Sequence, residues 1–331
     1  HGYTSSMATR KMIKEIDIQK PDIIHLHNLH CGYVNIKILF QYISKKNIPV
    51  VWTLHDSWSY TGGCSNYYAI NCTQWIEGCY KCNNRKQYPI SLFFDRTKKQ
   101  WINKKKLFTS INDMYIITPS VWLKKEVMKS FLNKYNIQVI NNGINLDVFK
   151  PTKNNIKKIY NIEGKYIILC VADIWNKRKG ISDIFEQSRF IDDNSIIVIV
   201  GTIKKYLTIK SNKIIYVNRL QNMEDLAKWY SIADIYINPT YEDNFPTTNL
   251  EALACGTPVI TYNTGGSPEA IDEKTGIITN EKNAISLFDA IKKVKQSVIK
   301  RNDCIQRAQT LFNKHIQFEK YYQLYKNIYK K

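Results

Sequence analysis

Short runs of isoleucine and valine alternate with amphipathic stretches of helical periodicity along most of the chain, and this alternation constrains the fold more than any other feature. The apolar runs occupy residues 22–26, 49–54, 114–118, 138–140, 166–172, 195–201, 213–217, 234–238 and 258–262. Continuous apolar strands separated by helices are typical of parallel sheets that helices cover on both faces. The pattern therefore predicts an α/β protein built from doubly wound, Rossmann-like sheets.

The apolar runs fall into two groups, which are separated by a polar stretch at 151–155. Domains average about 150 residues, so a chain of 331 residues has room for two. We expect one Rossmann-like domain over 1–150 and a second over 151–331. Because the chain opens with a helix-like stretch at 6–16 rather than with a strand and a glycine-rich turn, we expect the first domain to be incomplete at its start.

An apolar stripe marks a predicted helix near the end of the chain. The stripe consists of Phe312, Phe318, Tyr321, Tyr322, Leu324, Tyr325 and Ile328. This helix either crosses back to the first domain or packs on its own domain, and the spacing fits both arrangements.

The composition excludes several classes of protein. The apolar content of 44% is too high for a disordered chain, and no apolar run approaches the roughly 18 residues that span a bilayer. No signal-peptide pattern opens the chain, so we expect a cytoplasmic protein. The 48 Lys and Arg residues outnumber the 28 Asp and Glu residues, and the net charge is +20. Because the basic residues are dispersed, this charge fits either an ordinary basic surface or a patch that faces a polyanion or an anionic membrane.

The segment 241–260 carries the strongest indication of a site. It reads as a loop after a strand, followed by a helix in which Pro246 suits the first turn and which Gly256 ends. The start of this helix therefore lies at the carboxyl end of a parallel strand, where such sheets bind ligands. Free backbone N–H groups near Thr247 and Thr248 suit a diphosphate.

Acidic residues flank this helix start, and they have two interpretations. Glu242 and Asp243 lie in the loop, and Glu251 lies one turn into the helix, where it is suited to accept hydrogen bonds from ribose hydroxyls. Alternatively, acids near a helix start serve only as partners of the helix dipole. A second loop, at 173–180, places basic residues before another helix, where they would neutralise a departing diphosphate or form an exposed basic turn.

These motifs resemble those of GT-B glycosyltransferases of family 4. In that family, two acids eight positions apart flank a Phe-Pro loop and precede Glu-Ala-x-Ala-Cys-Gly-Thr-Pro-Val. Asp243 and Glu251 have this spacing, and segment 264–269 follows where the family has its Gly-Gly motif. The family usually has Glu at the first position, so either Asp243 or Glu242 takes that role. The resemblance covers about 21–279 of the chain.

The resemblance also implies how the basic loop acts. In the family, an Arg and, about five residues later, a Lys before Gly hold the donor diphosphate. Lys179 and Gly180 match the second part, whereas Asp173 and Ile174 occupy the region of the earlier Arg. Arg178 is the candidate substitute for that missing cation.

Histidines follow two strands of the first half. His55 directly follows the run 49–54, and the resemblance implies that it contacts the donor sugar near the reaction centre. His27 and Asn28 follow the preceding run and are candidates for facing the acceptor. A packed or capped histidine is the alternative interpretation at both positions.

Four cysteines cluster within the predicted insertion 57–90. They are Cys64, Cys72, Cys79 and Cys82, and the last two form a Cys-x2-Cys pair. Such a group is typical of structural zinc, although the wider gaps leave free or redox-labile thiols as the alternative. This cluster and its Thr-Leu-His-Asp-x-Trp lead-in resemble a subgroup of the family that acts in capsule and colanic-acid-type polysaccharide synthesis.

The resemblance therefore implies a retaining hexosyl- or glycosyltransferase that moves a sugar from a UDP- or GDP-type donor to a saccharide or lipid-linked saccharide. It implies no catalytic metal, and a lipid-linked acceptor would bring peripheral contact with the inner face of the membrane. The expected catalytic residues are His55, Lys179 and Asp243. The expected donor-binding residues are Arg178, Glu242, Asn244, Phe245, Pro246, Thr247, Thr248 and Glu251.

Three other functions stay open at this point. The charge and the four thiols would suit a zinc-braced nucleic-acid-binding protein, but no RNA- or DNA-binding motif is present, so we expect no nucleic-acid partner. A GT-B nucleotide-sugar epimerase would use the same donor site without an acceptor. Finally, an incomplete first domain would leave the chain inactive.

Overall fold

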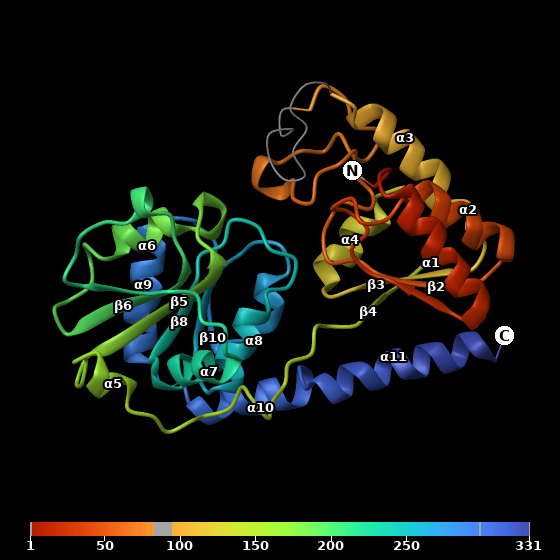
Figure 1. Ribbon diagram of the computed structural model, residues 1–331. Coiled ribbons are helices and arrows are strands. Elements are labelled where there is room, and N and C mark those ends of the chain that lie inside the picture. Colours follow the sequence, from red (N-terminus) through yellow and green to blue (C-terminus); the bar gives the residue numbers. More distant parts are fainter. Residues whose placement is uncertain (1, 83–94, 298, 331) are drawn as a thin grey trace. The chain divides into compact units, whose positions relative to one another are not determined.

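A computed structural model describes residues 2–82, 95–297 and 299–330 (Figure 1). The chain forms two compact units, one of His1–Asn141 with Glu319–Lys331 and the other of Asn142–Phe318. The sequence boundary expected between 150 and 151 thus lies inside the second unit. Each unit is an α/β structure around a parallel sheet, as the apolar runs predict.

The first unit contains a four-stranded parallel sheet in the order β1-β2-β3-β4. The strands are β1 (Ile24–Leu26), β2 (Val50–Thr53), β3 (Met114–Thr118) and β4 (Asn136–Val139). The helical segments are α1 (Ser6–Gln19), α2 (Ile36–Lys46), η1 (Tyr68–Ile70), α3 (Thr97–Phe108), α4 (Val121–Met128) and the larger part of α11 (Lys314–Tyr329).

Helix α2 shows how the local sequence sets an element. The Asn35 side chain accepts a hydrogen bond from the backbone N–H of Ile38 and so caps the helix start. Asn47, in a left-handed conformation, ends the helix. Phe40 lies on the buried face, where its ring packs 5.7 Å from Trp52 and 4.6 Å from Phe108, measured between ring centroids. These rings belong to the core on one face of the sheet.

Helix α11 covers the other face of the first sheet. Leu324 and Ile328 pack there with Val51, Tyr115 and Ile117. The face that packs recurs at the i, i+3, i+4, i+7 spacing of 321, 324, 325 and 328, as a single helix face requires.

Three members of the predicted apolar stripe do not belong to this face. The side chains of Phe318 and Tyr322 are 62% and 54% exposed. Phe312 follows the preceding helix and packs in the core of the second unit. The stripe prediction was therefore too wide, because only one side of the helix meets the sheet.

The second unit contains a six-stranded parallel sheet in the order β10-β9-β8-β5-β6-β7. The strands are β5 (Tyr166–Ile174), β6 (Ser195–Thr202), β7 (Ile214–Val217), β8 (Ile235–Asn238), β9 (Val259–Tyr262) and β10 (Gly276–Thr279). The helical segments are α5 (Ile156–Ile159), η2 (Lys177–Lys179), α6 (Ile181–Gln187), η3 (Lys205–Leu207), α7 (Met223–Ile232), α8 (Thr247–Ala254), η4 (Ser267–Ala270), α9 (Ala284–Gln296) and α10 (Arg301–Leu311).

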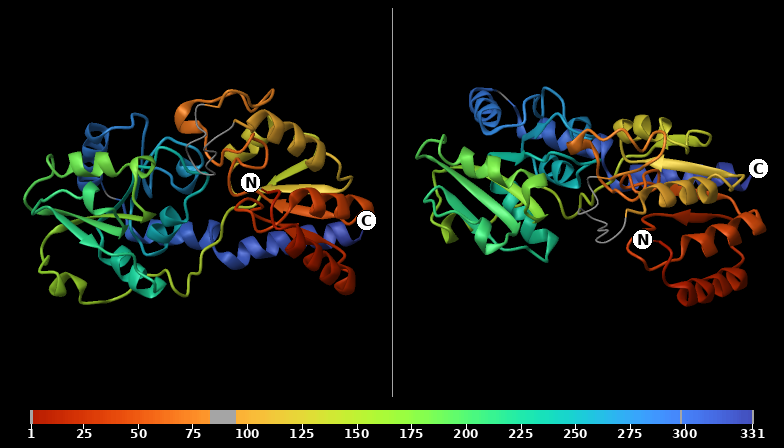
Figure 2. Two further views of the ribbon diagram at one scale, coloured as in Figure 1. Left: turned by 45° about the horizontal axis from the view of Figure 1, so that its top comes forward. Right: turned by 90° about the horizontal axis from the view of Figure 1, so that it is seen from above.

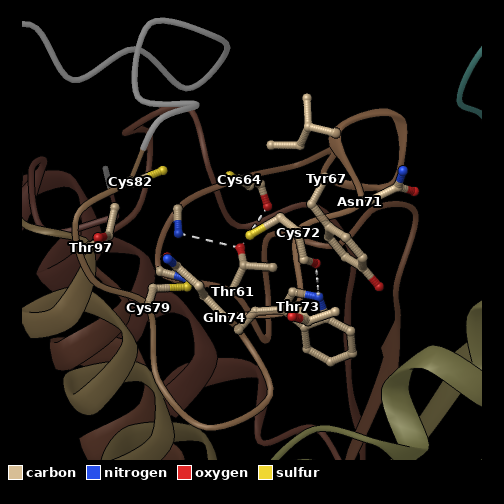
Figure 3. Close-up of a pocket in the computed structure, with 14 residues that line it drawn as sticks. Thr61, Cys64, Tyr67, Asn71, Cys72, Thr73, Gln74, Cys79, Cys82 and Thr97 are labelled. Carbon is tan, nitrogen blue, oxygen red and sulfur yellow. Dashed lines mark hydrogen bonds between the residues drawn. The ribbon is translucent and has the colours of Figure 1, made fainter.

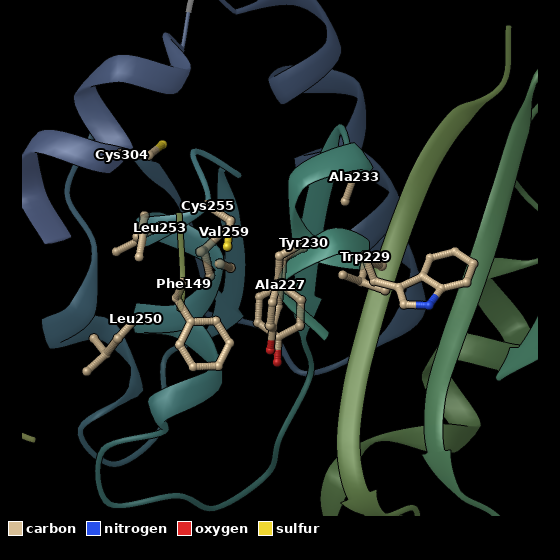
Figure 4. Close-up of a cluster of buried hydrophobic side chains, with 14 of the residues drawn as sticks. Phe149, Ala227, Trp229, Tyr230, Ala233, Leu250, Leu253, Cys255, Val259 and Cys304 are labelled. Atoms are coloured by element: carbon tan, nitrogen blue, oxygen red, sulfur yellow. The ribbon is translucent and has the colours of Figure 1, made fainter. Parts of the chain in front are cut away.

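Successive residues of β5 point into cores on opposite faces of this sheet. Ile167 and Leu169 pack with residues of α7, α8 and α10, whereas Ile168 and Cys170 pack with residues of α6 and α9. Helices therefore cover both faces of this sheet (Figure 2). In the first of these cores, the Tyr230 ring lies beside Phe149 (Figure 4). The doubly wound architecture is therefore confirmed for this unit.

Within the described ranges, no helix combines the length and the apolar character needed to cross a membrane.

Candidate active site

The sheet of the second unit changes its winding direction between β5 and β8. From β5 the chain continues outward through β6 and β7, and from β8 it continues in the opposite direction through β9 and β10. Doubly wound sheets bind ligands outside the carboxyl ends of the strands at such a reversal. The loops that leave β5 and β8, at 175–180 and 239–246, are the two loops in which sequence analysis places the donor site.

Lys179 and Asp243 meet at this reversal point. The Asn176 side chain accepts a hydrogen bond from the Lys179 backbone N–H, 3.1 Å away, and so caps η2. The Lys179 Nζ atom lies 2.7 Å from Asp243 Oδ2, and the two side chains are 23% and 20% exposed. The structure therefore brings together two of the three residues that are predicted to be catalytic.

Asp243 and Glu242 are distinguished by their surroundings. Glu242 is only 4% exposed, and its carbonyl oxygen accepts a hydrogen bond of 2.8 Å from the Arg178 guanidinium. Arg178 thus joins the two loops through the backbone of Glu242. Of the two candidate acids, Asp243 is the one in contact with Lys179.

Gly180 allows the two loops to approach closely. Its φ angle of +75° lies in the left-handed region, and a Cβ atom there would lie 2.1 Å from the carbonyl oxygen of Pro239. Only glycine fits without displacing one of the loops. Gly180 therefore helps to set the position of Lys179 relative to the loop that carries Asp243.

Helix α8 begins at Thr247, and Pro246 occupies the N-cap rather than the first turn. The helix ends at Ala254 with Cys255 as its C-cap, and Gly256 follows in the left-handed conformation (φ +80°) that ends a helix, as expected. The first N–H groups of any α-helix have no partner within the helix. Thr247 is exposed and Thr248 half-buried, so this end of the helix is partly open to solvent.

The interior of the same loop is held by buried side chains. Asn244 is 9% exposed and Phe245 is 3% exposed, and the Phe245 ring packs 5.9 Å from that of Phe312 in the core. Phe245 therefore offers a ligand its backbone rather than its ring. Asn249, which sequence analysis missed, accepts a hydrogen bond from Asn238 and donates one to the Ser267 carbonyl oxygen, joining three segments of this edge.

Glu251 lies on the second turn of α8 and accepts a hydrogen bond of 3.1 Å from the Tyr230 hydroxyl. Burial raises the pKa of the Glu251 carboxyl, and hydrogen bonds from Tyr230 and Thr247 oppose that shift. Because Tyr230 is completely buried, Glu251 also serves to satisfy a core hydroxyl. Its carboxylate is thus held in one orientation.

Lys282 is a further cation at this edge that sequence analysis did not identify. It follows β10, and its Nζ atom donates a hydrogen bond of 3.4 Å to Thr264 Oγ1. Burial lowers the pKa of Lys282, while the negative charge of Glu242 opposes that shift. No local sequence signal marks it, because it lies 40 residues from Glu242 in a loop without a recognisable motif.

The first unit has its own polar group at the carboxyl edge of its sheet. His27 Nδ1 and His55 Nε2 lie 3.0 Å apart, and the two rings stack. His25, the middle residue of β1, lies 2.8 Å from Thr53 Oγ1 and 2.6 Å from the Tyr325 hydroxyl, measured from its two ring nitrogens. The structure thus brings His27 and His55 together.

These histidines favour the neutral form. Burial lowers the pKa of His27 and of His55, and at His55 the nearby His27 adds to the effect. Burial also lowers the pKa of His25 to about 4, with further contributions from His27 and His55. A neutral His27–His55 pair has one nitrogen to donate and one to accept in its shared hydrogen bond. Asn28, the other predicted acceptor-side residue, is exposed, and its carbonyl oxygen accepts a hydrogen bond from Tyr33.

The four clustered cysteines line one cavity of about 390 Å³ in the first unit (Figure 3). They are Cys64, Cys72, Cys79 and Cys82, and the last residues of the predicted insertion, 83–90, lie outside the described residues. Among residues 2–82, 95–297 and 299–330, no three His, Cys, Asp or Glu side chains are arranged closely enough to hold a metal ion. The four cysteines therefore line the same cavity, but their side chains do not converge on a common point.

Comparisons with known proteins agree with this architecture. A sucrose-phosphate synthase from Thermosynechococcus elongatus superposes with a TM-score of 0.73 at 18% identity, over 97% of this chain and 77% of that one. The Anabaena protein HepE, solved in complex with UDP, superposes with a TM-score of 0.68 at 13% identity, over 96% and 82% of the two chains. These similarities establish the fold, which is that of the GT-B glycosyltransferases.

Sequence comparisons identify the family. The model of glycosyl transferases group 1 matches residues 152–311, and that of glycosyltransferase family 4 matches residues 1–148. The putative colanic acid biosynthesis glycosyl transferase WcaC of Escherichia coli K12 is 24% identical over 93% of this chain and 77% of its own length. The capsular polysaccharide biosynthesis glycosyltransferase CapM of Staphylococcus aureus is 24% identical over 54% of this chain and 51% of its own length. The two models together match nearly the whole chain, so the chain belongs to the glycosyltransferases that combine a family 4 domain with a group 1 domain, and it is an enzyme.

Proposed function

We propose that this enzyme transfers a sugar from a nucleoside-diphosphate donor to a saccharide acceptor in the synthesis of a surface polysaccharide, with retention of configuration at the anomeric carbon. The observation that carries the proposal is the contact of Lys179 with Asp243 at the winding reversal of the second sheet. A cation and a carboxylate side by side suit a substrate that has a diphosphate and a sugar at adjacent positions.

Lys179 would bind the diphosphate without leaving Asp243. A lysine ammonium has three N–H donors, so it can contact the carboxylate and a phosphate oxygen at the same time. The N–H groups at the start of α8 would add a second, weaker attraction for the diphosphate. As the bond to the sugar breaks, both groups would stabilise the negative charge that develops on the leaving nucleoside diphosphate.

The carboxylates would orient the rest of the donor. Asp243 accepts hydrogen bonds and is half-buried, which suits it to the sugar hydroxyls, and Glu251 is held by Tyr230 in an orientation that suits the ribose. Arg178, through the backbone of Glu242, would keep the loop in place. In the first unit, we propose that His55 contacts the transferred sugar, as the family resemblance implies, and that His27 and Asn28 face the acceptor.

The names of the relatives support the proposed donor and acceptor classes. We propose a UDP- or GDP-type donor, as the family resemblance implies, and the structures of HepE with UDP and with UDP-glucose support the UDP type. The names of WcaC and CapM support a polysaccharide product. A Campylobacter jejuni relative, 29% identical over 45% of this chain, is named for an undecaprenol-linked acceptor. A lipid-linked acceptor would bring this basic protein to the membrane surface, where lysine-rich surfaces bind anionic lipids.

A thermal-shift panel of UDP-, GDP- and ADP-sugars tests the donor proposal. A ligand at one hundred times its dissociation constant stabilises the folded state by about 2.7 kcal/mol. For a domain of the size of the second unit, this corresponds to a rise in melting temperature of about 5–10 °C. The donor class that gives this shift is then incubated with saccharide and undecaprenol-linked acceptors, and the anomeric configuration of the product is read by NMR. A folded enzyme that no nucleotide sugar stabilises would contradict the proposal, and an epimerised donor without transfer would identify an epimerase.

Added divalent cations separate this mechanism from a metal-dependent one. If Lys179 and the start of α8 neutralise the leaving group, transfer should proceed at the same rate without added Mg²⁺ or Mn²⁺. A strict requirement for either ion would show that these groups do not suffice.

Glu251 requires a conservative change, because its carboxylate also accepts the hydrogen bond from Tyr230. In Glu251→Gln, the amide oxygen can still accept this bond, and the folded state should be retained. We expect weaker binding of the nucleotide in this variant, whereas Glu251→Ala would also leave a buried hydroxyl without its partner.

A further inference from the structure

Four cysteine residues that the transfer reaction does not use lie in the segment between β2 and α3. We propose that Cys64, Cys72, Cys79 and Cys82 bind one structural zinc ion, which braces this segment. The first observation in favour is that all four residues line the same cavity of about 390 Å³ (Figure 3). Four thiols are the donor set of closed, tetrahedral zinc sites, and the Cys79–Cys82 spacing is that of a zinc knuckle.

Cys79 is held in the manner of a metal ligand. The Gly62 backbone N–H donates a hydrogen bond of 3.0 Å to the Cys79 sulfur. A Cβ atom on Gly62 would lie 2.6 Å from the Cβ atom of Cys79, so no other residue allows this approach. This hydrogen bond fixes the orientation of the Cys79 sulfur atom, as the neighbours of metal ligands usually do.

The backbones of the other three cysteines are also fixed. The Asp95 carboxylate accepts one hydrogen bond from the Cys82 N–H (2.7 Å) and another from the Thr97 N–H (2.9 Å), which ties Cys82 to the start of α3. The indole N–H of Trp75 donates to the Cys72 carbonyl oxygen, 2.9 Å away. In the same way, the Thr61 hydroxyl donates to the Cys64 carbonyl oxygen at 2.6 Å. A neighbouring side chain therefore holds the backbone of each of these three cysteines.

A buried lysine accompanies the thiols. Lys104, on α3, is completely buried, and its Nζ atom donates hydrogen bonds to the carbonyl oxygens of Trp58 and Thr61, at 2.5 and 3.2 Å. Its ammonium also lies 3.6 Å from the centroid of the Trp58 ring. Across the described ranges, Lys104 forms no ion pair with a carboxylate within 4.0 Å. Four thiolates around Zn²⁺ carry a net charge of −2, and a buried ammonium nearby would offset part of it.

The segment has little regular structure with which to hold itself. Between Thr53 and α3, the described residues contain one short helical turn, η1, and no strand. The segment nevertheless buries large side chains, among them Trp58, Tyr60 and Trp75. Segments of this kind are commonly stabilised by a metal. Because the segment follows His55 directly, the ion would also keep the end of β2 in place.

Zinc binding would draw the thiols inward. With Zn–S bonds of about 2.3 Å in a tetrahedron, the sulfur atoms lie about 3.8 Å apart. The cavity that they line gives them room to turn toward a common point. The proposal therefore requires side-chain movement, while the backbone contacts of the four residues persist.

Metal analysis of the purified, reduced 331-residue chain tests this inference. We expect about one zinc ion per chain by elemental analysis, and a loss to below about one tenth in Cys79→Ser/Cys82→Ser. Cys31→Ser and Cys304→Ser are matched controls outside the cluster, and they should keep the wild-type zinc content. Cys82→His should retain zinc, because zinc accepts three cysteines and one histidine.

Cobalt substitution keeps the test valid if the double variant fails to fold. Wild-type chain loaded with Co²⁺ should show the intense visible absorption of a tetrahedral site together with a sulfur-to-cobalt charge-transfer band. A wild-type chain without zinc and without this band would overturn the inference, as would unchanged zinc in the double variant. Non-reducing mass spectrometry that shows disulfides among the four residues would also overturn it. None of these readouts involves a nucleotide sugar, so they are independent of the proposed transfer reaction.

Discussion

Replacement of Lys179 by methionine tests the central contact of the proposed donor site. The change keeps the apolar stem and removes the ammonium that lies 2.7 Å from Asp243. Because both side chains remain about one fifth exposed, loss of this ion pair should change the free energy of unfolding by less than about 1 kcal/mol. A charge-assisted hydrogen bond to a phosphate contributes about 1.5–3 kcal/mol. We therefore expect nucleoside diphosphate to bind about 10- to 150-fold more weakly.

The measurement is titration calorimetry with UDP and GDP at constant ionic strength, with urea unfolding to confirm the stability. Lys228→Met is the matched control, because Lys228 also pairs with a carboxylate at 2.7 Å in the same unit. That pair lies on α7, and its loss should leave nucleotide binding unchanged. If folded Lys179→Met bound the nucleotide within about twofold of the wild type, Lys179 would not contact the diphosphate and the proposed site would be wrong.

Three further predictions concern the polar edges of the two sheets. Tyr325→Phe removes the hydroxyl bonded to His25 and should lower the free energy of unfolding by about 1 kcal/mol, whereas Tyr322→Phe, on the exposed side of the same helix, should have no effect in urea titrations. Burial lowers the pKa of His25 to about 4, so the unfolded chain binds a proton at higher pH than the folded chain does. The free energy of unfolding should therefore fall as pH decreases from 6.5 toward 4, by up to about 2 kcal/mol at pH 5. His25→Gln should flatten that pH profile. Gly180→Ala should destabilise the second unit by at least about 2 kcal/mol, through its φ of +75° and a clash with a carbonyl oxygen, whereas Gly164→Ala, with φ +76° and open space, should cost only the smaller backbone strain of about 1 kcal/mol.

The second unit was the more predictable part of the fold. The apolar runs 166–172 and 195–201 become β5 and β6 with ends shifted by at most two residues, because long central strands are buried on both faces and contain almost only apolar side chains. By contrast, β10 was missed. It has four residues, including Gly276, and it is identified only by its pairing with β9. A short edge strand leaves too weak a pattern in the sequence.

Some contacts of the candidate site could also be predicted from the sequence, and others could not. The meeting of Lys179 and Asp243 was foreseeable, because both follow neighbouring strands of a parallel sheet and so emerge at one edge. The contact of His25 with Tyr325 was not, because 300 residues separate the two and neither belongs to a motif. The interior position of Phe245 was also missed. An aromatic residue in a motif can contact the ligand or pack in the core, and the sequence alone does not distinguish these two roles.

Helix α11 makes the first unit discontinuous in sequence, and this has a consequence for folding during synthesis. The core on one face of its sheet needs Leu324 and Ile328 beside Val51 and Ile117. These partners are made 207 to 277 residues apart, so the ribosome must produce the whole second unit before that core can close. Until then the early strands carry an uncovered apolar face, which is the kind of surface that chaperones bind. The second unit, whose residues are contiguous, is free to fold first.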